Sequence, residues 1–266
     1  VKGLIKNRMR SLLTTLGVII GVASVIVMVG IGAGAQADIE TQISSLGSNM
    51  LMIFPGASRH GGASGGAGSF NKLTLDEADA IRERAQLVSA VSGVVTTGGQ
   101  VIGGVGDWNT RIMGVSTEYP AIRSWNVERG RFFEERDVRS RGKVAVVGMT
   151  IVDELFPNED PLGQQIRINK TPFRIIGVLE KKGASSFGRD EDDQILVPVT
   201  TALYRLSGSQ YINMIFVSAR SFEESEAAEE EISEILREEL RVNPGEDDPF
   251  RSGLQRGRRT VSRRTG

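Results

Sequence analysis

The sequence feature that most constrains this chain is an uncharged apolar run at residues 12–31, LLTTLGVIIGVASVIVMVGI. An α-helix of this length is about 30 Å long, which matches the hydrocarbon thickness of a bilayer. The polar side chains Thr14, Thr15 and Ser24 can donate hydrogen bonds to carbonyls one turn earlier in the same helix. Residues 12–31 are therefore predicted to form one transmembrane helix.

Basic residues flank this run on its N-terminal side, at Lys2, Lys6, Arg8 and Arg10. The next basic residue after the run is Arg59. By the positive-inside rule, residues 1–11 stay in the cytoplasm and the bulk of the chain lies outside it. We expect a single-pass protein of the cell (inner) membrane, in contact with membrane lipid.

Two other interpretations of the apolar run are less favoured. A cleaved signal peptide would explain the basic start and the small residues Ala33, Gly34 and Ala35, but its apolar core is usually about 7–15 residues long. A buried core helix is usually amphipathic rather than uniformly apolar. The transmembrane interpretation accounts for both the length and the flanking charge.

Small residues within the run indicate close contact with a second helix. Gly17 and Gly21 have the Gly-x-x-x-Gly spacing that lets two helices approach closely in lipid, and Ala23 and Ser24 extend the small surface. Because glycine is common in membrane helices, this spacing alone is weak evidence. The expectation is that the helix packs against other membrane helices through these four residues.

The remaining chain has the patterns of an α+β protein, with strands and helices mixed without a regular βαβ rhythm. Residues 32–48 are expected to form a stalk helix, and residues 49–250 a two-lobed mixed α/β extracytoplasmic domain. An outer lobe at about 136–205 would be inserted into a membrane-proximal lobe. Capping boxes at Thr74-x-x-Glu77 and Ser221-x-x-Glu224 predict two helix starts.

Hydrophobic patterning and turn residues predict the other elements of this domain. Short helices are expected after a Thr150 cap and, with a threonine cap, through Leu203 and Leu206. Expected strands lie at residues 50–54, 88–95, 100–105, 110–115, 144–147, 166–168, 173–179, 195–199 and 214–217, the last of these being the final strand.

The composition is poor in catalytic signals. There is no cysteine and one histidine, His60, so thiolate chemistry and multi-histidine metal sites are excluded. A Walker A pattern is absent, so this chain is not expected to hydrolyse ATP. The net charge of −1 gives no support for nucleic-acid binding. We expect no enzymatic activity, no cofactor and no nucleic-acid partner.

Two further features have both a functional and a structural interpretation. The acidic run at residues 190–193 could coordinate Ca²⁺, but it lacks the alternating spacing of such loops, so a solvated tip of a mobile polar loop at residues 183–193 is favoured. Trp108 and Trp125 could stack on a ligand, but packing is the commoner role of tryptophan. No metal site is therefore predicted.

Several segments together resemble MacB/FtsX-type ABC transporter permeases. The segments are NRMRSLLTTLGVIIGVA at 7–23, GAQ at 34–36, ISSLGSN at 43–49, LTLDEA at 73–78, VERGRFF at 127–133, LFP at 155–157, DPLGQ at 160–164, FRIIGVL at 173–179, and DD at 192–193 with VP at 197–198. Their number and order over about residues 5–250 make the resemblance specific.

The resemblance implies a function that composition does not show. Such permeases have four membrane helices, with an extracytoplasmic domain between the first two. They form a homodimer or pair with a related permease subunit, bind an ABC-type ATPase subunit, and in some cases bind a periplasmic adaptor. Mechanotransmission through the helices then moves antibiotic, peptide or lipoprotein substrates outside the membrane. Here the segment after Arg10 would be the lever and residues 32–48 the stalk.

The end of the chain departs from the family pattern. Residues 251–266 are expected to be a disordered or non-native tail, and not the strand expected before a second membrane helix. The tail is basic at Arg251, Arg256, Arg258, Arg259, Arg263 and Arg264. A truncated or frameshifted gene is favoured over a genuine basic tail that binds lipid.

Two other functions stay open. One is a membrane-anchored scaffold that regulates a cell-envelope partner such as a cell-wall hydrolase. The other is a single-span binding module that works without an ATPase.

Overall fold

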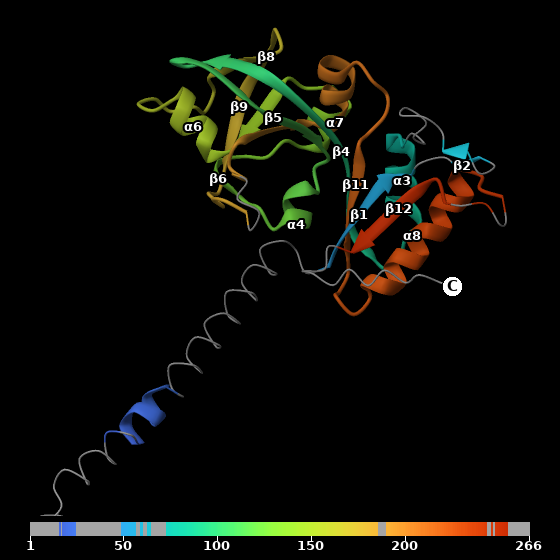
Figure 1. The fold of residues 1–266 in the computed structure, drawn as a ribbon. Helices are drawn as coiled ribbons and strands as arrows, with labels where there is room; N and C mark the ends of the chain where they lie inside the picture. The colour runs from blue at the N-terminus through green and yellow to red at the C-terminus, as the bar shows by residue number, and fades with distance from the viewer. Residues whose placement is uncertain are drawn as a thin grey trace, which may run out of the picture. The chain divides into compact units, whose positions relative to one another are not determined.

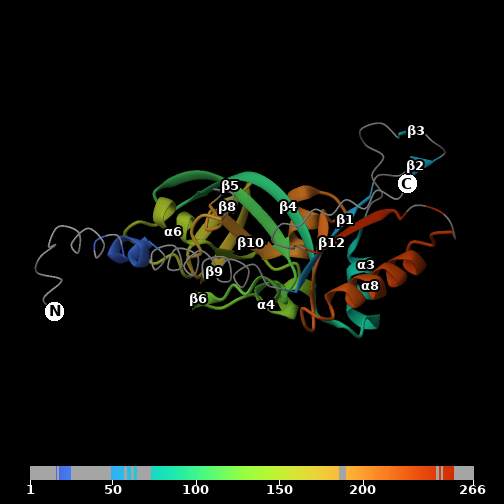
Figure 2. The ribbon, with the colours of Figure 1, turned by 60° about the horizontal axis from the view of Figure 1, so that its bottom comes forward.

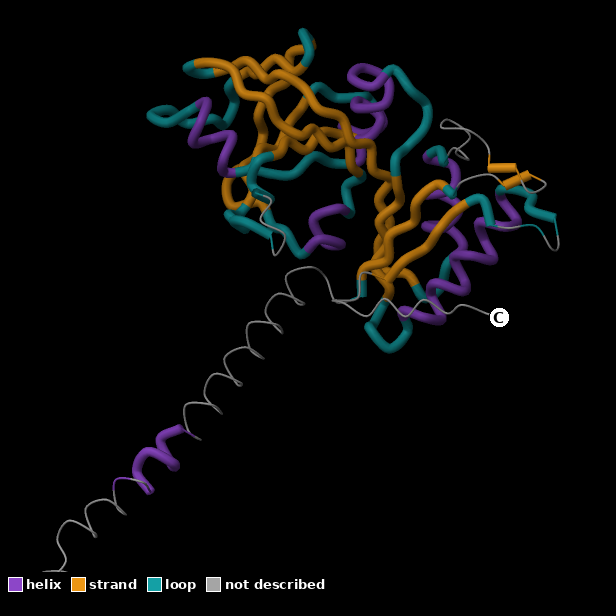
Figure 3. Tube along the Cα trace, viewed as in Figure 1, coloured by secondary structure: helices purple, strands orange, loops and turns teal. Residues whose placement is uncertain are grey.

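The computed structural model describes residues 16, 18–24, 49–56, 59–60, 63–64, 73–185, 190–243, 246 and 248–254. The chain divides into two compact units, residues 1–45 and residues 46–266, and each is described by itself. Figure 1 shows the second unit as a sheet with helices on its faces, and Figure 3 colours its strands orange and its helices purple.

In the first unit, residue 16 and residues 18–24 are helical. Ser24 Oγ donates a 2.8 Å hydrogen bond to the carbonyl of Ile20, as predicted from the sequence. Within the residues that the structure describes, no helix reaches the length and apolarity needed to cross a bilayer. Most of the predicted span and the whole of the expected stalk helix, residues 32–48, lie outside the described residues, so both stay predictions.

The second unit is built on one 10-stranded sheet with the order β12-β1-β11-β4-β5-β10-β7-β9-β6, in which β8 pairs with both β4 and β9. The strands are β1 Met50–Pro55, β4 Val88–Gly103, β5 Gly106–Val115, β6 Val127–Gly130, β7 Val144–Val147, β8 Gln165–Ile168, β9 Thr171–Leu179, β10 Gln194–Pro198, β11 Met214–Ala219 and β12 Phe250–Leu254. A separate pair consists of β2 Arg59–His60 and β3 Ala63–Ser64.

Six of these strands form a closed ring, because β8 joins β9 back to β4: the ring runs β4-β5-β10-β7-β9-β8. Alternate residues on each strand point into the ring, where they form part of the larger apolar core. Val101, Ile112 and Ile168 are 0% exposed there. The pairing of β8 with β4 closes the ring, so these two strands do not present free edges to each other.

The other part of the sheet, β12-β1-β11-β4, is open and carries helices on both faces. On one face lie α3 Leu75–Arg84 and α8 Ser225–Glu239, which Figure 2 shows beside β1 and β12. Ile81 and Ile232 from these helices are buried in the same apolar core as Ile53 of β1. On the other face, Tyr119 of α4 Tyr119–Arg123 packs on Phe216 with a ring separation of 6.0 Å.

The long strand β4 belongs to both parts. Its first half pairs with β11 at residues 88–94, and its second half pairs with β5 at residues 95–103. The sequence predicted two separate strands here, with a break at Gly98-Gly99, and this prediction was wrong. Both glycines stay in the antiparallel ladder opposite Arg111 and Thr110, so the strand continues through them.

The remaining helices are short: α5 Glu135–Arg139, α6 Met149–Leu155, α7 Val199–Thr201 and the π-helical turn η1 Ala202–Ser207. The predicted threonine cap is not formed: Pro198 is the N-cap residue of α7, and Thr201, which directly precedes η1, makes no capping hydrogen bond with its side chain. Thr150 is not a cap either: α6 begins after Gly148, and the Thr150 hydroxyl instead donates to Asp190 Oδ2 at 2.6 Å.

The two predicted capping boxes had different outcomes. Thr74 and Glu77 form a full capping box at the start of α3, which confirms that prediction. The Ser221 hydroxyl accepts from the backbone N–H of Glu224, but α8 begins only at Ser225. The Ser221–Glu224 pair therefore closes a turn that precedes the helix. The predicted inward residues of α8, including Ile232 and Leu236, are buried.

The mixed α/β nature of the domain is confirmed. The predicted boundary at residue 250 is corrected, because the sheet continues past it. Residues 251–254 belong to strand β12, so the prediction of a disordered tail was wrong for this part, and Met214–Ala219 is not the final strand. The rest of the tail lies outside the described residues. The predicted outer lobe at 136–205 stays a prediction, because residues 46–266 form one compact unit and the ring also includes β4 and β5.

Candidate functional site

Most of the residues predicted to lie in or beside the membrane are outside the described residues. Gly21, Ala23 and Ser24 are helical and exposed, whereas Gly17 and the basic flank of Lys2, Lys6, Arg8 and Arg10 lie outside the described residues. A Cβ added at Gly21 would meet no atom of the described residues within 4 Å. Its role in helix packing stays a prediction.

The first described strand of the second unit lies directly beside the last described strand. β1 and β12 are antiparallel, with Leu51 opposite Leu254 and Pro55 opposite Phe250. Figure 1 shows the two arrows side by side and pointing in opposite directions. The first residues of β1 and the last residues of β12 therefore lie at the same end of this strand pair. We call residues 49–56 with 248–254 the terminal junction.

Local chemistry holds the far end of the terminal junction together. The backbone N–H of Gly56 donates to the Pro249 carbonyl at 2.7 Å. A Cβ at position 56 would lie 2.8 Å from the Phe250 nitrogen, so this close approach of two backbones requires glycine. The Phe250 side chain is 4% exposed and joins the main core.

Side chains from α8 also bind the C-terminal segment of the terminal junction. Ser252 Oγ donates to Glu229 Oε1 at 2.6 Å. Arg237 binds Asp248 through two parallel hydrogen bonds of 2.7 and 2.8 Å. This bidentate geometry raises the pKa of Arg237 above its usual value. The terminal junction is thus tied to helix α8 as well as to the sheet.

On the inner side, β1 connects the terminal junction to the rest of the sheet. β1 pairs with β11 in antiparallel register, and β11 pairs with β4, which enters the closed ring. Leu51 and Ile53 are at most 1% exposed in the core. Two ladders of hydrogen bonds therefore connect β1 to the ring.

A cluster of polar side chains binds the two ends of the segment that joins β9 to β10 to each other. Asp192 is 2% exposed, and its two carboxylate oxygens accept the backbone N–H groups of Lys182 and Gly183, each at 2.8 Å. Glu191 forms an ion pair with Arg123 of α4 at 2.9 Å. We call this arrangement the carboxylate clamp.

The aromatic residues around the carboxylate clamp have structural contacts. The Trp125 indole N–H donates to the Glu180 carbonyl at 2.7 Å, and the Lys182 ammonium lies 5.0 Å from the Trp125 ring centre. Burial lowers the pKa of Lys182, and the nearby Arg123 charge adds to this effect. Burial also raises the pKa of the Tyr119 hydroxyl above 10.0.

The carboxylate clamp corrects the prediction of a solvated acidic loop tip at residues 190–193. Asp192 and Glu191 are bound as described, and Asp193 accepts from the Trp108 indole N–H at 2.9 Å. Sequence reasoning missed this because the partners lie far away in the chain, on β5, α4 and α6. Among the described residues, no group of three acidic or histidine side chains could hold a metal ion.

Packing was the favoured role for both tryptophans, and it is what the structure shows. Trp125 is 0% exposed within the smaller core, and Trp108 packs against the larger core while its indole binds Asp193. Arg123 and Lys182 were not singled out from the sequence, and no local pattern around them points to their roles.

Solved structures share this fold at low sequence identity. The periplasmic region of MacB from Actinobacillus actinomycetemcomitans superposes with a TM-score of 0.64 at 23% identity, covering 80% of this chain and 91% of that chain. The extracellular domain of the noncanonic ABC-type transporter YknZ from Gram-positive bacteria gives a TM-score of 0.62 at 16% identity, covering 77% of this chain and 100% of that chain. The fold is therefore one that extracytoplasmic regions of transport proteins adopt.

Sequence comparison assigns the family. The model of the MacB-like periplasmic core domain matches residues 11–235, so this chain belongs to that family. The macrolide export ATP-binding/permease protein MacB of Chlorobium luteolum is 40% identical over 241 residues, which is 91% of this chain. That of Bdellovibrio bacteriovorus is 39% identical over 236 residues, or 89% of this chain. This chain spans 36% of the length of each of these two relatives.

Proposed function

We propose that this chain is part of the permease of an ABC transporter of the MacB type and couples ATP hydrolysis by a partner ATPase to export outside the membrane. Family membership supports the class. The observation that carries the coupling role is the terminal junction, where the chain comes into and leaves the domain on adjacent strands. Two membrane segments attached there would act on the domain at one place.

In this proposal, residues 12–31 are a membrane lever and residues 32–48 a stalk. A movement of the stalk reaches β1 first. Because β1 is paired on both sides, with β12 and β11, it would move together with its neighbours instead of separating from them. The β11 and β4 ladders would then carry the displacement to the closed ring.

The partners and location follow from the same proposal. The permease would bind an ABC-type ATPase subunit and form a homodimer or pair with a related permease subunit in the cell (inner) membrane. A periplasmic adaptor is a further proposed partner. The named relatives are macrolide exporters, so macrolides are the first substrates to test, followed by peptides and lipoproteins.

The function is tested by expressing the chain in a macrolide-sensitive strain, together with the proposed partner ATPase from the same organism and the proposed remaining segments of the permease. We expect macrolide resistance that needs both the chain and an intact ATP site, and co-purification of the ATPase. Resistance unchanged by deletion of the chain would contradict the proposal. Co-purification of a cell-wall hydrolase without any export phenotype would favour the scaffold function.

The terminal junction is tested in the same assay by a matched glycine pair. Gly56→Ala places a Cβ 2.8 Å from the backbone of β12, whereas Gly106→Ala meets no atom within 4 Å. We expect Gly56→Ala to reduce resistance at equal expression and Gly106→Ala to leave it unchanged. Equal resistance in both variants would refute a coupling role for the junction.

The proposed packing face is tested with Gly17→Leu combined with Gly21→Leu. Large side chains at these positions would keep two helices apart in lipid, so subunit crosslinking and transport should both fall. Unchanged crosslinking and transport would exclude helix packing through these glycines.

A further inference from the structure

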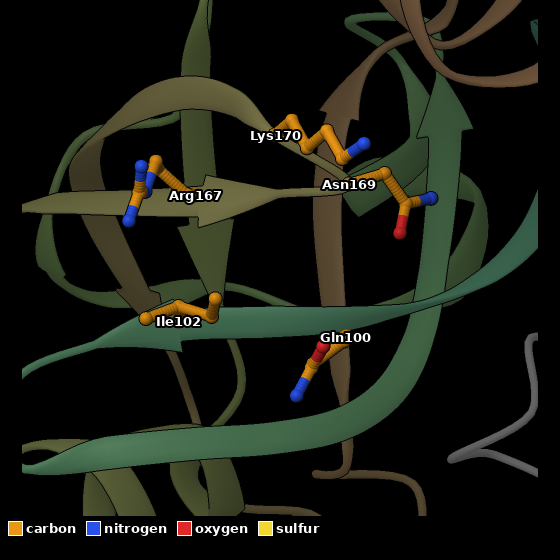
Figure 4. A pocket seen from close by; sticks show the side chains of 5 residues that line it. All are labelled: Gln100, Ile102, Arg167, Asn169 and Lys170. Atoms are coloured by element: carbon orange, nitrogen blue, oxygen red, sulfur yellow. The ribbon is translucent and has the colours of Figure 1, made fainter.

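An uncovered groove lies on the outside of the closed ring, where β4 pairs with β8. It has a volume of about 410 Å³ and is lined by Gln100, Ile102, Arg167, Asn169 and Lys170. Figure 4 shows Gln100 and Ile102 on β4, with Arg167, Asn169 and Lys170 on the β8–β9 hairpin. A cavity of this size accommodates a small molecule.

Strand register explains why the groove has this lining. Val101 and Ile168 are paired and point into the ring, where both are 0% exposed. The next pair, Ile102 with Arg167, therefore points outward. This arrangement places an exposed apolar side chain and a guanidinium directly across from one another.

The charge in the groove is positive and only partly balanced. Among the described residues, Arg167 and Lys170 form no ion pair or side-chain hydrogen bond. The nearest carboxylate that the groove residues bind is Asp107, whose Oδ2 accepts from the Gln100 amide at 2.7 Å. Two cations thus face the groove together with the Asn169 amide.

The backbone at the hairpin tip holds Lys170 in the left-handed region, which is unfavourable for a residue with a Cβ. Asn169 and Lys170 form a two-residue turn with φ values of 45° and 74°. Such turns favour asparagine at the first position and glycine at the second, because a Cβ is disfavoured in the left-handed region. A lysine that occupies the glycine position indicates a use for its side chain.

Two glycines on β4 keep the groove open. A Cβ at Gly99 would lie 2.6 Å from the Asn169 amide oxygen, so glycine makes room for that side chain. A Cβ at Gly98 would meet no atom within 4 Å, so the surface beside Gln100 is bare backbone. Glycine inside a strand often marks a place where a ligand approaches closely.

We propose that this groove binds a phosphate monoester group. Arg167 offers a planar fork of donors to two phosphate oxygens, Lys170 supplies a second positive charge, and the Asn169 amide a further donor. Two cations match the charge of a phosphate monoester, which is about −1.5 to −2 at neutral pH. Ile102, 43% exposed, provides an apolar surface beside the phosphate. This inference does not depend on the proposed export function.

The test is titration calorimetry of the full chain in a neutral detergent at low ionic strength. The probes are dihexanoyl phosphatidate, inorganic phosphate and dihexanoyl phosphatidylcholine, which lacks a monoester. We expect phosphatidate to bind and phosphatidylcholine not to bind. Phosphatidate binding that exceeds phosphate binding and falls in Ile102→Ser identifies a lipid source, whereas equal binding of both, insensitive to Ile102→Ser, identifies a soluble phosphate.

Matched variants locate the binding. Arg167→Gln with Lys170→Gln should weaken phosphatidate binding about tenfold or more, because hydrogen bonds to charged groups are the strong ones. Lys143→Gln with Arg220→Gln removes two exposed charges outside the groove and should change the affinity less than about twofold. Asp107→Asn removes the nearby negative charge and should strengthen binding.

Several results would overturn the proposal. These are the absence of phosphatidate binding, equal binding of phosphatidylcholine, and equal losses in the groove and control double variants. Binding of an acidic peptide that depends on Arg167 and Lys170, without any binding of phosphatidate, would assign the groove to a protein partner instead. All of the substituted side chains are exposed, so each variant is expected to fold, and an unchanged far-ultraviolet circular dichroism spectrum checks this.

Discussion

Replacing Asp192 by alanine tests whether the carboxylate clamp stabilises the domain. The Asp192 carboxylate is 2% exposed and accepts two backbone hydrogen bonds of 2.8 Å. A hydrogen bond to a charged acceptor contributes about 1.5–3 kcal/mol net, and alanine also leaves both N–H groups without an acceptor. The lower end of this range for two bonds predicts a loss of about 3 kcal/mol in the free energy of unfolding.

The expected change in melting temperature follows from the size of the domain. For a chain of about 150–250 residues, 1 kcal/mol shifts the melting temperature by roughly 2–4 °C, so a fall of roughly 6–12 °C is expected. Tryptophan fluorescence of the full chain in detergent is a suitable assay, because Trp125 and Trp108 both lie beside the carboxylate clamp.

Two further variants separate the clamp from a general effect of charge. Asp153 is exposed and on another element, so Asp153→Ala should leave the melting temperature within about 1 °C, as expected for a surface substitution. Asp192→Asn retains one carbonyl oxygen and should lose about half as much stability as alanine, since it accepts one of the two N–H groups. Equal melting temperatures of Asp192→Ala and Asp153→Ala would refute the prediction.

Three other predictions concern packing, the terminal junction and pH. Ile232→Ala should reduce the free energy of unfolding by about 2–5 kcal/mol in chemical denaturation, because the side chain is 1% exposed between α8 and the sheet. Gly56→Ala should cost about 1–3 kcal/mol through overpacking and speed amide hydrogen exchange in β12, while Gly106→Ala changes neither. For Tyr119, the folded pKa lies above the unfolded value of 10.0, so above pH 10 the unfolded state loses its proton first and stability falls. Tyr119→Phe should lack this alkaline loss in melting curves taken across pH 9–11, and identical curves for the two proteins would contradict it.

Local sequence patterns predicted the elements whose stabilising contacts are local. The capping box of Thr74 and Glu77 and the inward face of α8 are set by residues three or four positions apart, so they can be read directly from the chain. Strands were likewise predicted at 166–168 and 173–179 from local patterning, and both form on either side of the turn at Asn169 and Lys170. Such signals do not depend on which distant segment packs nearby.

Features made by distant segments were missed. β4 continues through Gly98-Gly99 because β5 supplies partners for both residues, and the turn-like glycine pair gives no hint of this. β12 forms because β1 offers an edge about 200 residues earlier in the chain, while its own basic sequence suggested a tail. The carboxylate clamp likewise needs Arg123 of α4 to be brought to Glu191, 68 residues later in the chain.

The closed ring has a consequence for the order of folding during synthesis. All of its strands lie within residues 88–198, so the ring can close as soon as this stretch has left the ribosome. The open sheet has to wait, because β1 is made before the ring strands whereas β11 and β12 are made after them. Until Phe250–Leu254 arrives, one edge of β1 carries unpaired backbone groups, which is the condition under which a nascent chain pairs with the wrong strand.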